Sequence, residues 1–191
     1  MRFFSILCGA ISLCGMAHAE AAFQVPKGFD DCHHAVYGRA EKKIAADQIE
    51  TISEGIVPLT HVGPLRGIQF DTNTSLFTIR HTGTYVINYF LKAHTRNPGT
   101  VNARKILAIS VQVNNTEKGT LNLDPVEEER FYPFSLWTGN GLIFENLRKG
   151  DTVGLTVTKA TELAGFFNFY EGEDLPPDTV AYLTIRKAET K

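Results

Sequence analysis

Short runs of β-favouring residues, separated by turn residues, constrain the fold of this chain more than any other feature. The clearest run spans residues 75–80, where Phe77 and Ile79 lie on one face and Leu76, Thr78 and Arg80 on the other. Alternation with a period of two is typical of a strand that buries one side. No long helical period appears, so we predict an all-β protein.

Further runs follow at intervals typical of sandwiches and barrels. They span residues 85–91, 106–113, 131–137, 142–147, 152–158, 164–169 and 179–186. Both faces of the run 85–91 are apolar. Residues that favour turns stand between the runs, at 81–83, 114–116, 139–141, 149–151 and 171–177. Asn140-Gly141 between two apolar runs predicts a tight hairpin.

Residues 1–19 have the features of a secretory signal. Arg2 precedes an apolar stretch over residues 3–13, and the small residues Ala17 and Ala19 follow. The stretch is far shorter than the ~20 residues of a membrane span, so we predict no membrane span and cleavage after Ala19. Leu13 directly before Cys14 argues against a lipoprotein signal. The mature protein is expected in the periplasm, at the cell surface or outside the cell.

Cleavage would leave Cys32 as the only cysteine, which excludes an internal disulfide. Its thiol would stay buried and inert or pair with another chain. We predict that residues 20–46 form a short N-terminal extension, with a helix across residues 35–46 or an irregular path. The β domain is predicted to span residues 47–191.

The charge balance indicates no polyanionic partner. The chain has 19 basic and 21 acidic residues and a net charge of −2, which becomes −3 once Arg2 is removed. No basic patch for nucleic acid or anionic lipid is evident in the sequence. Gly-x-Ser-x-Gly, His-Glu-x-x-His, a phosphate-binding glycine loop and Cys-x-x-Cys are all absent. We therefore expect no catalytic residues and a protein that is not an enzyme.

Four motifs occur in an order that resembles a known family. Residues 67–70 lead into the run 75–79, Gly83-x-Tyr85 opens the next run, residues 109–115 end in an asparagine turn, and Gly150-Asp151 follows Leu147. A last run, 180–185, closes the series. The order resembles that of the C1q/TNF-like jelly-roll domains, among them the C-terminal domain of the collagen-like spore surface glycoprotein of bacilli. The residues of the motif are Phe77, Gly83, Tyr85, Gly150 and Asp151.

The resemblance implies a two-sheet jelly-roll β-sandwich that forms a homotrimer and binds a protein or glycan ligand multivalently. The aromatic content, 13 Phe, 6 Tyr and 1 Trp, exceeds what one small core readily hides. Candidates for a trimer interface are Tyr85, Tyr89, Phe144 and Tyr182. The alternative is that all four lie in the core of the monomer, with the tyrosine hydroxyls bonded.

Several candidate sites remain open. Glu171, Glu173, Asp174 and Asp178 form a candidate ligand loop, whose carboxylates would suit calcium, although a plain solvated loop is the commoner explanation of such residues. We expect no other cofactor.

Cys32-His33-His34 carries metal-binding residue types. Neighbours along a strand point to opposite faces, so we assign no metal site there.

Two other functions stay open beside the multivalent trimer. The first is an envelope or coat component joined through Cys32 and the extension. The second is a monomeric carbohydrate-binding sandwich with Trp137 as a stacking platform.

Overall fold

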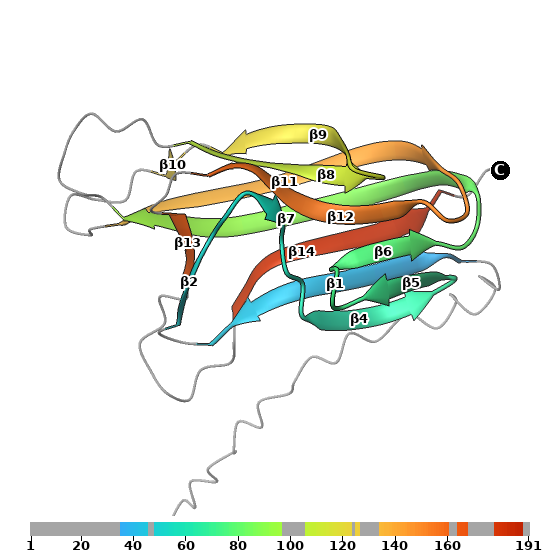
Figure 1. Ribbon diagram of the computed structural model, residues 1–191, viewed down its shortest axis with the longest axis horizontal. Coiled ribbons are helices and arrows are strands. Elements are labelled where there is room, and N and C mark those ends of the chain that lie inside the picture. The colour runs from blue at the N-terminus through green and yellow to red at the C-terminus, as the bar shows by residue number, and fades with distance from the viewer. Residues whose placement is uncertain are drawn as a thin grey trace, which may run out of the picture. The chain divides into compact units, whose positions relative to one another are not determined.

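Two antiparallel sheets pack face to face in the computed structural model (Figure 1). The structure describes residues 35–45, 48–96, 106–123, 125–126, 134–160, 164–167 and 178–188. These residues belong to one compact unit, His34–Lys191. The described elements are all strands, which confirms the predicted all-β sandwich.

The first sheet has six strands that pair in a continuous order, and two short strands that pair outside this order. The order is β10 (Pro125–Val126), β11 (Phe134–Leu147), β7 (Gly83–Arg96), β14 (Asp178–Lys187), β1 (Tyr37–Ile44) and β4 (His61–Arg66). Beyond these, β13 (Ala164–Phe167) pairs with both β7 and β2 (Ile49–Thr51).

The second sheet has five strands in a continuous order. They are β5 (Ile68–Asp71), β6 (Leu76–Ile79), β12 (Thr152–Ala160), β8 (Leu107–Val113) and β9 (Thr116–Leu123). The short β3 (Gly55–Ile56) pairs with β12.

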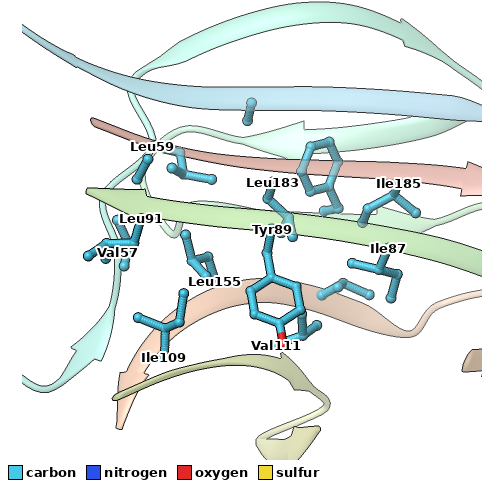
Figure 2. Close-up of a cluster of buried hydrophobic side chains, with 14 of the residues drawn as sticks. Val57, Leu59, Ile87, Tyr89, Leu91, Ile109, Val111, Leu155, Leu183 and Ile185 are labelled. Atoms are coloured by element: carbon cyan, nitrogen blue, oxygen red, sulfur yellow. The ribbon is translucent and has the colours of Figure 1, made fainter. Parts of the chain in front are cut away.

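The core lies between the two sheets. Along β7, Tyr85, Ile87, Tyr89 and Leu91 point inward and are at most 2% exposed. Figure 2 shows three of them beside inward side chains from other strands: Ile109, Val111, Leu155, Leu183 and Ile185. Burial of this alternating set is the main force that holds the sheets together. Phe77 and Ile79 of β6 are also fully buried, as their alternation predicted.

The hairpin predicted at Asn140-Gly141 is absent, because β11 runs through it as one strand paired with β7 from Phe134 to Leu147. The glycines provide space instead of a turn. A Cβ atom on Gly141 would lie 2.1 Å from Cζ of Tyr89, and one on Gly139 would lie 1.9 Å from Cδ2 of Leu123. Glycine at these positions lets large core side chains approach the backbone of β11.

The helix predicted across residues 35–46 is also wrong, because this segment contains β1. β1 pairs with β14 on one side and β4 on the other. Gly38, Ala40, Lys42 and Ile44 alternate inward and are buried. Pairing on both edges and burial of one face outweigh the weak helix preference of Ala, Lys and Glu. The sandwich therefore begins before residue 47.

Several connections gather at one end of the sandwich, which we call the turn end (Figure 1). Here the main-chain N of Gly150 donates to the O of Ile79 at 2.8 Å, and that of Lys187 donates to the O of Val36 at 2.9 Å. The turn residues Asn114, Asn115 and Gly150 have φ of 48°, 65° and 96°. These values confirm the turns predicted at 114–116 and 149–151.

Candidate functional surface

The side chains of the first sheet that point away from the core form a second, solvent-facing surface. We call it the outer face. Strand register aligns its side chains in rows across β11, β7 and β14: Phe144 with Val86 and Arg186, Leu142 with Asn88 and Thr184, and Asn140 with Phe90 and Tyr182. On β1, Arg39 lies opposite Thr184, and Glu41 lies opposite Tyr182.

The β11 side of the outer face is apolar and exposed. Leu142 and Phe144 are 57% and 66% exposed, the highest values among the exposed large hydrophobic residues of the described chain. Their inward neighbour Ile143 packs against the core. Adjacent exposed apolar side chains of this size are typical of interaction sites.

An aromatic pair occupies the centre of the outer face. The rings of Phe90 and Tyr182 stack with centroids 5.2 Å apart and an interplanar angle of 17°. The guanidinium Cζ of Arg39 lies 4.9 Å from the centroid of Tyr182. Since β14 lies between β7 and β1, Tyr182 is held between Phe90 and Arg39.

A charged cluster on β1 borders this pair. Arg39 donates to Glu41 through Nη2 at 2.9 Å and Nε at 3.2 Å, and Nζ of Lys43 lies 3.0 Å from the same carboxylate. Burial raises the pKa of Glu41, but the hydrogen bonds from Lys43 and Arg39 outweigh it and lower the pKa below its ordinary value. The carboxylate therefore stays ionised and fixes Arg39 over Tyr182.

Asn88 places a buried polar atom in the middle of the outer face. Its Oδ1 is buried and accepts no hydrogen bond, while its main-chain O accepts one from the hydroxyl of Thr184 at 3.2 Å. An unsatisfied buried acceptor costs about 1–3 kcal/mol. A buried side-chain oxygen without a hydrogen-bond donor is rare in proteins, so its presence at the centre of the outer face requires a structural or functional explanation.

The four predicted interface residues divide into two pairs. Phe144 and Tyr182 lie on the outer face, but Tyr85 and Tyr89 are core residues, which corrects the prediction that they line an interface. Their hydroxyls donate to main-chain oxygens, that of Tyr85 to His81 at 2.5 Å and that of Tyr89 to Gly119. Burial raises the pKa of both hydroxyls.

The remaining residues on which the resemblance rests have structural roles. Phe77 is fully buried, and Gly83 opens β7 beneath the side chain of Lys187. The carboxylate of Asp151 accepts from the main-chain N of Arg148 at 2.7 Å and from Asn114 at 2.8 Å. These bonds lower the pKa of Asp151, the Arg148 bond most, and tie two turns together.

Three other predictions concern the loop residues, the cysteine segment and the tryptophan. Glu171, Glu173, Asp174 and the Cys32-His33-His34 segment lie outside the described residues, and Asp178 opens β14 opposite Ile44. Trp137 is only 2% exposed, so it offers no stacking platform, which corrects that proposal.

Two further features of the described residues concern metal binding and membrane crossing. In these residues, no group of three or more His, Cys, Asp or Glu side chains could hold a metal ion. Within the same ranges, no helix has the length and apolar character needed to cross a membrane.

Sequence reasoning missed Leu142, Phe90, Asn88 and Arg39. A signal was present, because the run 85–91 is apolar on both faces and only one face can meet the core of a two-layer sandwich. Residues 139–141 were predicted as a hairpin and residues 35–46 as a helix. The strands that lie beside this second face, β11 and β1, were therefore not recognised.

No protein-family model matches this chain, and no curated protein sequence matches it significantly. The structure itself therefore defines the class: an all-β, two-sheet sandwich with a partly apolar outer face on one sheet.

Proposed function

We propose that this protein is an exported, non-enzymatic assembly and binding module of the C1q/TNF-like kind. In this proposal three copies associate through the outer face, and the homotrimer binds a protein or glycan ligand multivalently. The observation that carries the proposal is the exposed apolar pair Leu142 and Phe144 on a sheet whose other face already forms the core.

The pairing of the long strands supports a jelly roll. A jelly roll is a long antiparallel hairpin wrapped around a sandwich, so its first strand pairs with its eighth, its second with its seventh, and so on inward. Eight strands here pair in that nested way: β1 with β14, β6 with β12, β7 with β11, and β8 with β9.

The chemistry of the outer face suits a second copy better than a sugar. A sugar stacks on an open aromatic face, but Phe90 and Arg39 flank Tyr182 on its two sides. A protein surface can cover the exposed side chains of Leu142 and Phe144.

Multivalency follows from such an assembly. Three weak sites on one rigid particle raise the effective concentration of each after the first has bound, so affinity increases without new contacts. The proposed mechanism therefore requires two things: each monomer must be folded, and three copies must associate in one particle.

The test is the mass of the purified mature protein by light scattering after size exclusion. We expect three times the mass of the mature chain, with and without reductant. Phe144→Asp should give a folded monomer, because it places a charge in an apolar contact. Ile106→Asp is the matched control, since Ile106 is also a partly exposed apolar residue but precedes β8 of the second sheet.

Two outcomes would contradict the proposal: a monomeric native protein, or a Phe144→Asp variant that keeps the native mass. Circular dichroism and the melting temperature of both variants establish that they are folded. A ligand found by array binding should then be held more weakly by the Phe144→Asp monomer than by the native trimer.

A further inference from the structure

The turn end collects basic side chains from separate parts of the chain. They lie at the end of β4, after β6, after β11 and at the end of β14. The residues are Arg66, Arg80, Arg148, Lys149, Arg186 and Lys187.

Contacts between the connections place these residues at the same end. The main-chain N of Lys149 donates to the hydroxyl of Thr82 at 3.1 Å, and the side chain of Lys187 crosses Gly83. Tyr37 pairs with both Arg66 and Arg186, on its two neighbouring strands. The bond from Gly150 to Ile79 brings the turn at 149–150 beside Arg80.

Three of the six basic residues of the turn end form no ion pair with a carboxylate of the described chain. All six basic residues are exposed except Lys187, which is half-buried. In the described part of the chain, no carboxylate forms an ion pair with Arg80, Lys149 or Lys187. The carboxylate of Asp151 within the turns accepts hydrogen bonds from the main chain of Arg148 and from Asn114, and the charge of Arg148 also lowers its pKa, so Asp151 offsets part of the positive charge.

The nearest other carboxylates lie one or two residues along the strands. Glu145 on β11 lies 3.8 Å from Lys118, and Glu117 lies opposite Gln112 on β8. The turn end is therefore positive although the whole chain carries a net charge of −2.

Exposed apolar side chains stand among the basic ones. Tyr37 and Leu65 are both 38% exposed, and they lie beside Arg66 at the end of β4. Basic residues mixed with aromatic and aliphatic side chains are typical of surfaces that rest on anionic lipid, where the charges meet phosphate and the apolar groups enter the headgroup layer.

We propose that the turn end docks on the headgroups of an anionic lipid bilayer. Charge complementarity with the phosphates supplies the attraction, and Tyr37 and Leu65 favour a bilayer over a fully polar polyanion. The described chain begins and ends here, since the main-chain N of Ala188 donates to the O of Thr84. Docking would thus leave the opposite end of the sandwich facing away from the bilayer.

This inference stands without the proposed trimer, because each copy carries its own basic end. In a cyclic assembly with its axis along the strands, all the turn ends would face the same way. The trimer would then bind the bilayer more tightly through effective concentration. Only this gain in affinity rests on the proposed function.

The experiment is cosedimentation of the mature full chain with vesicles. Vesicles of phosphatidylcholine mixed with equal phosphatidylglycerol should bind the protein, and pure phosphatidylcholine should not. Added salt should weaken the binding, since it screens exposed charges. The variant Arg148→Gln/Lys149→Gln should bind about thirtyfold more weakly, from the contribution of two basic residues at the surface.

Lys92→Gln/Lys159→Gln is the matched control, because it removes the same charge from positions toward the opposite end of β7 and β12. Equal loss in both variants, or equal binding to both vesicle types, would overturn the inference. So would retention on immobilised heparin without vesicle binding, which would identify a polyanionic glycan as the partner. The Phe144→Asp variant separates the two proposals, since it should bind more weakly than the trimer but still prefer phosphatidylglycerol.

Discussion

At the scale of single residues, the core depends on close approaches that only glycine permits. Tyr89 fills the space above Gly141 on the neighbouring strand, and its hydroxyl reaches the main chain of Gly119 on β9. One tyrosine thereby ties β7, β11 and β9 together. Its inward position explains why an aromatic residue that the resemblance suggested for an interface is a core residue here.

Gly141→Ala should destabilise the protein by about 1–3 kcal/mol, as overpacked cores do. The added Cβ would lie 2.1 Å from Cζ of Tyr89, too close for the ring to stay in place. Urea unfolding measures the change. Thr138→Ala, an exposed change on the same strand, is the control and should have little effect; unchanged stability of Gly141→Ala would show that the ring moves freely.

His94 should make stability depend on pH. Burial, and then the charge of Lys92, lowers the pKa of His94 to about 4 from the ordinary 6.5. Between these values the unfolded chain binds a proton that the folded chain does not. Stability should therefore be full above pH 6.5 and fall as the pH falls towards 4.

The expected loss at pH 5 is on the order of 2 kcal/mol relative to pH 7. Urea unfolding at the two pH values measures it. His94→Gln should reduce the pH dependence, because it removes the buried group whose pKa is lowered. The same slope in His94→Gln and the native protein would exclude His94 as its source.

At the scale of elements, β1 is the strand that most changes the predicted organisation. It lies between β14 and β4, so removing it would leave both strands without a partner on that side. Its buried Lys42 lies 2.5 Å from the carboxylate of Glu50 on β2, which links two elements of the first sheet. The segment is thus part of the sandwich and not an extension of it.

A truncation series tests this assignment. A chain that begins at residue 35 should fold, whereas one that begins at residue 47 should lose the cooperative unfolding transition, because β1 and its buried face are missing. Circular dichroism and thermal unfolding distinguish the two. A stable, cooperative protein from residue 47 onward would mean that β1 is dispensable.

At the scale of the whole molecule, assembly is assigned to the outer face and lipid docking to the turn end. The outer face runs along β11, β7, β14 and β1, whereas the basic residues lie at the turn end, where these strands begin or finish. Arg186 belongs to both surfaces, since it lies in the same row as Val86 and Phe144. Arg148 and Lys149 follow the end of β11 and would stay free in an assembly through the outer face. The two proposals are therefore compatible, and the variants at Phe144 and at Arg148 and Lys149 test them separately.

Local patterns in the amino-acid sequence were sufficient to predict the all-β class, the strands β6, β7, β8, β12 and β14, and the turns at 114–116 and 149–151. These features are local, since alternation along a strand and the residues of a turn act over a few neighbours.

Long-range strand pairing established that residues 37–44 form a strand, that β11 passes through Asn140-Gly141, and that Tyr89 faces the core while Phe144 faces outward. It also decided where charge gathers, because Arg66, Arg148 and Lys187 meet only once distant strands have paired. Net charge and sequence spacing do not reveal which strands pair. The outer face and the basic turn end could therefore be identified only from the fold.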